Sequence, residues 1–418
     1  MSKNPPRRPI RVLSLVPRAV LLPFHSGGEI RVATLMRRLI PEFEFHILSF
    51  FPSGGKLDRI AAALELEARC GLHAFFCERT PGLAPDPDKP MIAADYWDPS
   101  MVRALRAAIV ERRIDVVQVE FTQMAQYARH AADLAPVVMT EHDSSVLSPG
   151  ASYYRTGDDG IEHSRRTRSY LEDCFSHCRR LVVLSAADAR RLEPLAGPGK
   201  IRVVPTGTET ERIAFKPLEG RRAAGALFIG HYPHYPNEDA AVFLCREVLP
   251  RLKRAVAGAT VSLVGSAPTA AVRALAGSDV DVIGEVADVA PHLWSAGVFI
   301  APMRLGFGIK GKVLEAFSAG LPVVATPEAC EAMPGLRDGR ELLIARGSEE
   351  LAAAAARLVG DRPFAARLAR AARRYVVSRF DWERQARLLR AVLREAADER
   401  GAATADRRPK RAVPAVRP

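Results

Sequence analysis

The sequence has few cysteines and no long apolar run. Its 418 residues include six cysteines, too few for a disulfide scaffold in a chain of this length. No stretch approaches the roughly 18 consecutive apolar residues of a membrane-spanning helix. The N-terminus is basic and then apolar, but Arg11, Pro17 and Arg18 interrupt the apolar run, and no clean signal-peptide cleavage pattern follows. We therefore expect a cytoplasmic protein whose membrane contact, if any, is peripheral.

The composition is that of a globular protein with a basic surplus. Hydrophobic residues make up 48% and charged residues 26% of the chain, which excludes disordered, collagen-like and coiled-coil classes. The net charge of +12 favours an anionic partner: a nucleotide, an anionic lipid surface or a nucleic acid. No basic stretch is interleaved with aromatic residues and no nucleic-acid motif is present. We therefore expect no nucleic-acid partner, although a non-enzymatic basic module for nucleic acid or membrane stays as an alternative.

Residues with metal-ligating side chains do not form a recognisable metal motif. Cys174 and Cys178 flank His177, but a structural zinc site normally needs four convergent ligands, and the surrounding sequence has the pattern of a partly buried helix. Asp158 and Asp159 form an acidic pair that we place in a polar loop. The sequence therefore predicts neither a bound metal nor another cofactor.

Apolar, β-branched runs alternate with helix-periodic segments along most of the chain. This alternation predicts α/β architecture with parallel sheets covered on both faces. The expected strands are 10–16, 44–50, 71–77, 115–119, 137–140, 180–184 and 201–204, then 226–230, 260–265, 280–283, 298–301, 322–325 and 341–344. The expected helices are 28–40, 99–112, 160–178 and 186–195, then 237–255, 269–275, 309–319, 349–359, 363–380 and 381–397.

The alternation pauses once, which divides the chain into two doubly wound Rossmann-like domains. We expect a first domain over 1–205, a linker over 206–220 and a second domain over 221–379. Such domains place a ligand cleft at the carboxyl ends of their strands. The Ala-, Arg- and Pro-rich tail over 401–418 is expected to be disordered.

The segment 301–326, APMRLGFGIKGKVLEAFSAGLPVVAT, has the strongest functional signal. A buried strand ends there, a turn with Gly306, Gly308 and Gly311 follows, and a helix begins. Glycines let a backbone approach a ligand closely, and the free N–H groups of a helix start attract phosphate. Lys312 and Glu315 share one helix face, and Arg304 precedes the turn. A cation and a carboxylate so placed suit a phosphate and the two hydroxyls of a ribose; a solvated Lys–Glu pair is the plainer alternative.

Other loops follow expected strands in the same way. Gly230 and His231 leave the first strand of the second domain, and Asn237 is expected to cap the next helix. In the first domain the turn His25–Ser26–Gly27–Gly28 precedes a helix without a GxGxxG fingerprint. His142 follows the strand 137–140, where a functional group or a structural histidine is expected, and the neighbouring Glu141 and Asp143 fit a loop-capping role.

The chain resembles the family 4 glycosyltransferases of GT-B fold, which are retaining enzymes that use nucleotide sugars. The residues that carry the resemblance run from Gly27–Gly28 through VVLSAADARRL, RVVPTGTE and FIGHYPHYPN to the glycine-rich turn with LEAFSAGLPVVAT. The resemblance implies two domains facing across a cleft. It also implies that the last helices, over about 380–398, cross back to complete the first, acceptor-binding domain.

By this resemblance, most of the implied site residues hold the donor. Glu315 would hold the donor ribose and Lys312 the diphosphate, with Arg304 as a further cation. Backbone groups of Phe307, Gly308 and Ile309 would lie against the sugar and phosphate. Gly28 would approach the phosphate from the other domain, and His142 would contact the transferred sugar. The sequence departs from the family in two places. Phe307 stands where a second glutamate is common. The basic residue usual after the first strand of the second domain is missing, and His231 is the residue nearest to that position.

The resemblance implies a metal-independent retaining hexosyltransferase. It would move a sugar from a nucleotide-diphosphate sugar to a glycan or lipid-linked acceptor, with surface polysaccharide biosynthesis as the setting that the resemblance implies. A nucleotide-sugar epimerase on the same fold is an alternative, as is a phosphorylase, for which no pyridoxal lysine can be placed. The donor base, the sugar and the acceptor do not follow from the sequence.

Overall fold

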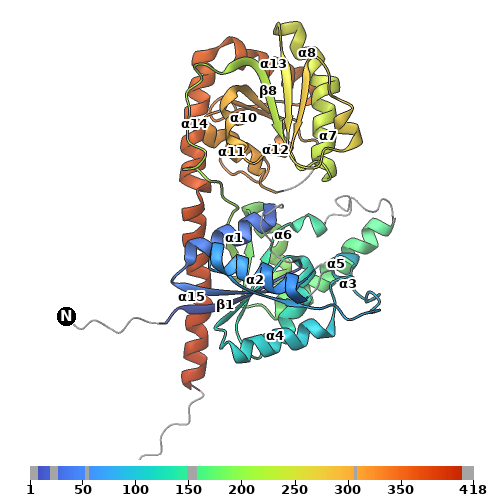
Figure 1. The fold of residues 1–418 in the computed structure, drawn as a ribbon, viewed down its shortest axis with the longest axis vertical. Helices are drawn as coiled ribbons and strands as arrows, with labels where there is room; N and C mark the ends of the chain where they lie inside the picture. Colours follow the sequence, from blue (N-terminus) through green and yellow to red (C-terminus); the bar gives the residue numbers. More distant parts are fainter. Residues whose placement is uncertain (1–7, 19–26, 52–55, 148–157, 306–307, 407–418) are drawn as a thin grey trace, which may run out of the picture. The chain divides into compact units, whose positions relative to one another are not determined.

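The computed structural model describes residues 8–18, 27–51, 56–147, 158–305 and 308–406 (Figure 1). The chain forms two compact units. The first comprises 1–183, 188–204 and 386–418, and the second comprises 184–187 and 205–385. Each unit has its own sheet and its own core. No helix in the described residues is long and apolar enough to cross a membrane.

The first unit is built on a parallel sheet with the order β3-β2-β1-β4-β5-β6-β7. Its strands are β1 Ile10–Val16, β2 Phe43–Phe50, β3 His73–Cys77, β4 Val116–Glu120, β5 Val137–Glu141, β6 Arg180–Val183 and β7 Ile201–Val203. Its helices are α1 Gly27–Leu39, α2 Lys56–Cys70, α3 Met91–Ala94, α4 Pro99–Glu111, η1 Thr122–His130, η2 Ser144–Leu147, α5 Asp158–Ser176 and α6 Ala186–Ala196. The strand order reverses between β1 and β4, which pair in parallel, and ligands of open α/β sheets bind at such switch points.

The second unit repeats this design with the order β10-β9-β8-β11-β12-β13. Its strands are β8 Arg222–Ile229, β9 Thr260–Val264, β10 Val280–Gly284, β11 Ala296–Ala301, β12 Val323–Ala325 and β13 Leu343–Ile344. Its helices are α7 Tyr235–Phe243, η3 Leu244–Val248, α8 Leu249–Ala255, α9 Ala270–Arg273, α10 Ala290–Ser295, α11 Gly311–Ala319, α12 Pro327–Cys330, α13 Gly347–Gly360 and α14 Arg362–Phe380. Its switch point lies between β8 and β11, which are also parallel neighbours.

The residues expected to form a linker belong to the second unit. Ile213 is fully buried and Leu218 is nearly so, both in the core of this unit. Arg221 is buried as well, and its guanidinium donates to the backbone oxygens of Leu293 and Ala319. The segment is therefore irregular in backbone but fixed by packing.

The last helix, α15 Trp382–Asp406, starts in residues of the second unit and continues in the first (Figure 1). Its Glu395 pairs with Arg180 of β6 and Arg202 of β7 at 2.7 and 2.9 Å. Arg394 pairs with Glu42, which precedes β2, at 2.5 Å. The helix ends later than predicted, since residues 401–406 are helical. Their Ala-rich sequence sustains the helix although Gly401 weakens it. Residues 407–418 of the expected tail lie outside the described residues.

The secondary structure differs from the sequence-based expectations in two further places. Within 51–96 only the strand 71–77 was named as an expected element, and the structure adds helices α2 and α3 there. The Ala-, Leu- and Glu-rich sequence of α2 is a strong helix former. Asp158 and Asp159 begin helix α5 rather than lying in a loop, a position that the helix dipole favours for acidic residues.

Gly265 supports the switch point of the second unit through close backbone contact. It has φ +138°, and a Cβ atom on it would lie 1.8 Å from the carbonyl oxygen of Gly230. We expect Gly265→Ala to destabilise the protein by about 3 kcal/mol or more, because both the backbone conformation and the contact must change. Chemical denaturation followed by circular dichroism measures this.

Gly277→Ala is the matched control, since a Cβ atom there has nothing within 4 Å. We expect a change of under about 1 kcal/mol for this variant. Equal stability of the two variants would contradict the packing argument.

Candidate functional site

The candidate residues of the second unit gather where β8 and β11 end. The loop after β8 carries Gly230 and His231, and the loop after β11 leads to Lys312 and Glu315 on α11. Gly308 has φ +76°, a conformation that favours glycine, and Ile309 is half-buried. Gly306 and Phe307 lie outside the described residues.

Lys312 is held between the two loops. Its ammonium donates to Oδ1 of Asn237 at 2.5 Å and lies 4.4 Å from the centre of the Phe228 ring at the end of β8. Asn237 in turn donates from Nδ2 to the backbone oxygen of His231 at 2.8 Å. The lysine is thereby fixed at the switch point.

The predicted role of Asn237 as a helix cap was wrong. Helix α7 begins two residues earlier, at Tyr235, with His234 at the N-cap position and no side-chain cap. Pro236 near the helix start suits the early start because it needs no backbone N–H there. The Asn237 side chain is therefore available to join the β8 loop to Lys312.

Burial brings the pKa values of Lys312 and Glu315 close together. Loss of water lowers the pKa of Lys312 to about 7, and the charge of Lys310 adds to this. Burial raises the pKa of Glu315 to about 7, against the opposing charges of Arg212 and Lys312. Both groups thus titrate near neutral pH, and a bound anion and its hydroxyls will shift them strongly.

Arg304 is already engaged by a carboxylate. Its guanidinium contacts both Asp239 oxygens, with Nε donating at 3.1 Å, and it lies 4.5 Å from the centre of the Phe243 ring. Half of its side chain is exposed. Arg304 can therefore act on a phosphate only by leaving or sharing Asp239.

His231 is exposed and its Nδ1 lies 2.8 Å from Oγ of Ser266. Gly230 beneath it is packed, because a Cβ atom there would lie 3.0 Å from Cβ of Asn237. The loop after β8 is thus shaped by contacts with Asn237 and Gly265, which leaves the His231 ring at the surface.

The candidate residues of the first unit lie in the loops that follow β1 and β5, next to the end of β4. Gly27 and Gly28 are the first residues of α1; His25 and Ser26 lie outside the described residues. A Cβ atom on Gly28 would lie 2.6 Å from Cζ of Phe121 and 3.9 Å from Nδ1 of His142. Gly28 is therefore required by the Phe121 ring, and the Nδ1 edge of His142 faces it.

His142 is oriented by a buried carboxylate. Its Nε2 lies 2.6 Å from Oε2 of Glu120, whose side chain is 1% exposed, and its ring stacks on Phe121 at 3.7 Å between centres. Phe121 has φ +71°, which is strained for a bulky residue. The backbone distortion, the stacked ring and the carboxylate all fix the imidazole.

The Glu120 contact selects one form of the histidine. Burial lowers the pKa of His142 although Glu120 opposes this, so the ring is neutral at pH 7. Because an ionised carboxylate only accepts, Nε2 carries the proton and Nδ1 is an acceptor. Arg31 lies buried near Glu120, donating from Nη2 to the Val204 oxygen at 2.8 Å, and burial lowers its pKa to about 10.

Glu141 has a structural role, as the sequence suggested. Its carboxylate accepts from the Thr122 hydroxyl at 2.7–2.8 Å and from the Asp143 backbone N–H at 3.2 Å. Burial raises the pKa of Glu141 to about 8. It therefore ties the η1 start to the loop that carries His142.

The possible metal ligands are used otherwise. Cys174 and Cys178 are buried thiols, and Sγ of Cys178 donates to the Cys174 backbone oxygen. His177 lies 3.9 Å from Asp173. Within the part of the chain that the structure describes, no group of three or more His, Cys, Asp or Glu residues is arranged to hold a metal.

Two family models match the chain, one in each half. The model described as Glycosyltransferase Family 4 matches residues 25–212, and that described as Glycosyl transferases group 1 matches residues 224–361. The chain belongs to the family 4 glycosyltransferases of GT-B fold. The expected fold class, with two Rossmann-like domains, is thereby confirmed.

Solved structures share the fold of this glycosyltransferase at low identity. HepE from Anabaena, in complex with UDP and glucose, is 14% identical with a TM-score of 0.64, covering 92% of this chain and 100% of its own. Sucrose-phosphate synthase from Thermosynechococcus elongatus is 16% identical with a TM-score of 0.69, covering 93% and 99%. WaaG, a glycosyltransferase involved in lipopolysaccharide biosynthesis, is 14% identical with a TM-score of 0.62, covering 93% and 99%. No curated protein matches the sequence.

The sequence reasoning missed several residues of the candidate site. Glu120 was overlooked because the strand was expected to end at 119, whereas β4 ends on Glu120 itself. A carboxylate closing an apolar strand next to the switch point was the available signal. Phe121 and Asp239 gave no such signal, since their roles depend on contacts between distant segments.

The tautomer of His142 can be measured directly. We expect ¹⁵N-edited NMR of the glycosyltransferase at pH 7 to show a neutral ring protonated at Nε2. In Glu120→Gln the histidine pKa should fall further, because the charge that raises it is gone.

Glu44→Gln is the matched control, since Glu44 lies 2.9 Å from Nε2 of His46 elsewhere in the first unit. This variant should leave the His142 signals unchanged. A ring protonated at Nδ1 in the unsubstituted protein would contradict the assignment.

Proposed function

We propose that this glycosyltransferase transfers a hexose from a nucleotide-diphosphate sugar to a glycan or lipid-linked acceptor, with retention of anomeric configuration and without a metal. The observation that carries the proposal is the half-buried Lys312–Asn237 pair with Glu315 at the switch point of the second unit. The HepE complexes with UDP and UDP-glucose support a nucleotide-sugar donor. The role of WaaG in lipopolysaccharide biosynthesis supports a setting in surface polysaccharide assembly.

Lys312 is the residue proposed to stabilise the leaving group. As the bond between the sugar C1 and the phosphate oxygen breaks, negative charge develops on the diphosphate. The protonated ammonium offsets this charge best in a site with little water. Gly308, Ile309 and the start of α11 would add backbone N–H groups. Gly306 and Phe307 complete the proposed donor loop, and Arg304 would assist after releasing Asp239.

Glu315 is proposed to hold the ribose. Among the described residues its carboxylate has no hydrogen-bond or ion-pair partner, and it lies one helical turn from Lys312 on the half-buried face of α11. Two vicinal hydroxyls can each donate to one carboxylate oxygen. Gly230 and His231 would line the same donor site from the β8 loop.

In the first unit, His142 and the Gly27–Gly28 turn are proposed to act on the transferred sugar and its phosphate. The Nδ1 acceptor of His142 suits a sugar hydroxyl. The acceptor hydroxyl would attack C1 from the face that the leaving group departs, and its proton would pass to the departing phosphate oxygen. Bonds and charge balance without a covalent enzyme intermediate.

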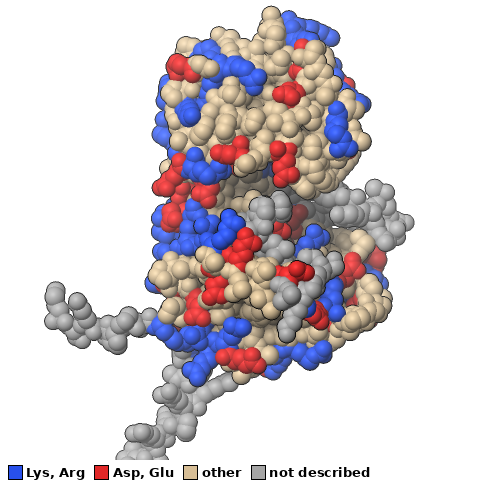
Figure 2. Space-filling model, viewed as in Figure 1, with Lys and Arg blue, Asp and Glu red and all other residues tan. Residues whose placement is uncertain are grey.

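We also propose that the enzyme acts in the cytoplasm and binds no nucleic acid, with peripheral contact to an anionic membrane at most. All six cysteines are free thiols, as is usual in a reducing compartment. On the face shown in Figure 2, Lys and Arg side chains are interspersed with Asp and Glu rather than gathered into one basic patch. This distribution favours an enzyme over a basic nucleic-acid module.

Substitution of the donor residues tests the proposal. A panel of nucleotide sugars is screened by thermal shift, and the selected donor is used to measure binding and release of nucleoside diphosphate. We expect Glu315→Ala to weaken donor binding about tenfold or more, because the ribose loses its acceptor. We expect Lys312→Ala to lower turnover more than affinity.

Lys253→Ala, on a surface lysine paired with Asp279, is the matched control and should behave as the unsubstituted enzyme. The proposal would be overturned if no nucleotide sugar of the panel stabilised the enzyme, or if Lys312→Ala had unchanged turnover. Conversion of the donor sugar without transfer to any acceptor would indicate an epimerase.

Donor affinity should depend on pH with a maximum near 7. Ribose binding needs ionised Glu315, so affinity falls as pH drops below its pKa of about 7. Phosphate binding needs protonated Lys312, so affinity falls as pH rises above its pKa of about 7. Isothermal titration with an intact nucleotide sugar, which does not itself titrate in this range, measures both limbs.

The two limbs are assigned by single variants. Glu315→Gln should abolish only the fall in donor affinity below pH 7, and Lys312→Met should abolish only the fall in donor affinity above pH 7. A pH-independent affinity between pH 6 and 8.5 in the unsubstituted enzyme would contradict these roles.

A further inference from the structure

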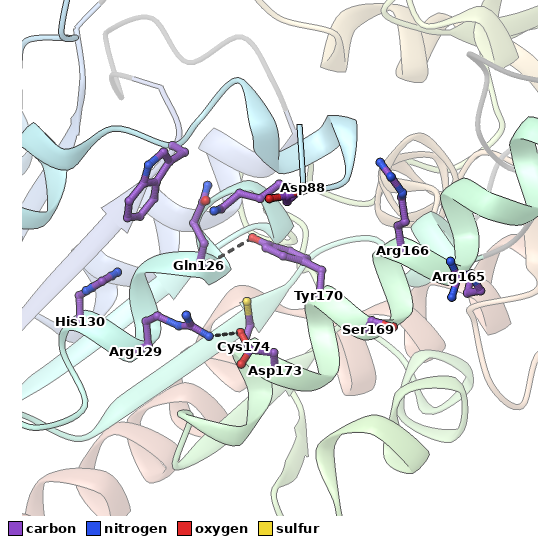
Figure 3. Close-up of a pocket in the computed structure, with 12 residues that line it drawn as sticks. Asp88, Gln126, Arg129, His130, Arg165, Arg166, Ser169, Tyr170, Asp173 and Cys174 are labelled. Carbon is purple, nitrogen blue, oxygen red and sulfur yellow. Dashed lines mark hydrogen bonds and ion pairs between the residues drawn. The ribbon is translucent and has the colours of Figure 1, made fainter. Parts of the chain in front are cut away.

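The first unit contains a cavity of about 670 Å³, within the size range of ligand sites. It lies between η1, helix α5 and the segment that carries Asp88 and Lys89 (Figure 3). None of the residues assigned to the donor line it. The cavity is therefore separate from the residues assigned to the donor.

The cavity shares its framework with the His142 site. The Tyr170 hydroxyl in its wall donates to the Thr122 oxygen at 2.9 Å and accepts from the Gln126 backbone N–H at 3.1 Å. The Thr122 side chain is bonded to Glu141, the residue before His142. Helix η1, which forms one wall, begins directly after Phe121, the residue stacked on His142. A ligand in the cavity is thus connected to the reacting end of the unit through one rigid helix.

An aromatic surface stands at one end of the cavity. Trp97 is half-buried, and its ring stacks on the fully buried Tyr127 with 5.6 Å between centres and 19° between planes. The His130 ring lies 5.6 Å away, and the Lys89 ammonium lies 4.6 Å from the Trp97 ring centre. A pyranose presents C–H groups on its face and hydroxyls around its rim. It would stack on Trp97 by taking the place of the Lys89 ammonium over the ring, with that ammonium and the His130 ring as its polar neighbours.

Paired polar groups line the remainder. Arg129 of η1 donates to Asp173 of α5 at 2.5 Å, as the dashed line in Figure 3 shows. Gln126 is 4% exposed, and its amide oxygen is buried without a hydrogen-bond partner in the described residues. An unpartnered buried oxygen is costly in a protein interior, and a ligand hydroxyl would satisfy it after a small opening of the wall.

The charges of the cavity favour a neutral ligand over an anion. Each cationic side chain of the lining already has a carboxylate: Lys89 pairs with Asp86, Arg129 with Asp173, and Arg165 and Arg166 with Glu162. Asp88 adds a further carboxylate. The four cations are therefore matched by four carboxylates. Such pairs offer donors and acceptors together, which suits hydroxyl groups, whereas a phosphate would have to displace the acidic partners.

We propose that this cavity binds the neutral saccharide part of the acceptor, with Trp97 as the stacking surface and the Arg129–Asp173 pair as the hydroxyl-binding group. The inference rests on the proposed glycosyltransfer, because that reaction requires a saccharide acceptor as well as a donor. It names neutral hydroxyl-rich glycans as the substrate class.

The test uses the full-length protein on an array of immobilised neutral, uronic-acid, sulfated and phosphorylated oligosaccharides. Asp173→Asn removes the carboxylate charge with little change of shape, and Trp97→Leu removes the aromatic face. Asp133→Asn is the matched control, since Asp133 pairs with Arg106 at 2.8 Å on the same unit but outside the cavity.

We expect the unsubstituted protein and Asp133→Asn to bind the same neutral saccharides. Asp173→Asn and Trp97→Leu should bind them at least about tenfold more weakly, since a hydrogen bond to a charged group contributes about that much. Equal binding by all four proteins, binding to acidic saccharides only, or no saccharide binding at all overturns the inference.

Nucleotide-sugar binding is measured by thermal shift on the same samples and should be equal in all four. If the unsubstituted protein binds saccharides but no nucleotide sugar, the proposed function is contradicted, and the proposed saccharide site in the cavity is not. Intact donor binding, with saccharide binding insensitive to Trp97 and Asp173, contradicts the cavity alone.

Discussion

The candidate site of the second unit centres on a half-buried lysine ammonium that is hydrogen-bonded to an amide oxygen rather than to a carboxylate. Lys312 is held by Asn237 and by the face of Phe228. A carboxylate in place of the amide would neutralise the ammonium permanently. The amide oxygen of Asn237 fixes the position of the ammonium and leaves its charge available to a bound anion. Gly265 packs against Gly230 in the β8 loop, and the early start of α7 leaves the Asn237 side chain to join that loop to Lys312.

The first unit solves a related problem with a histidine. Glu120 occupies Nε2 of His142 with a hydrogen bond, and the packing of Phe121 and Gly28 determines where Nδ1 lies. Strain at Phe121 is tolerated because the ring contact and the buried carboxylate hold the backbone there. Both units thus place one pre-oriented polar group at the point where their strand order reverses.

The sequence predicted the architecture well because alternating apolar strands and amphipathic helices are local signals. Lys312, Glu315, Gly28 and His142 followed from their positions after strands. The roles of Asn237 and Glu120 did not, because each depends on a partner 75 or 22 residues away. The pairing of Arg304 with Asp239 could not be predicted either, since the sequence around an arginine does not show whether a distant carboxylate neutralises its charge. Local pattern locates a site, whereas its charge state is decided by tertiary contacts.

Helix α15 gives the chain a particular order of assembly. The sheet of the first unit is complete at residue 203, yet the acidic partners of Arg180 and Arg202 lie on residues 395 and 399. During synthesis the strands of the first unit therefore emerge first, but β6 and β7 acquire these ion pairs only after the whole second unit has been made. A chain that stops before residue 395 would contain the complete second unit and a first unit in which Arg180 and Arg202 lack these carboxylates.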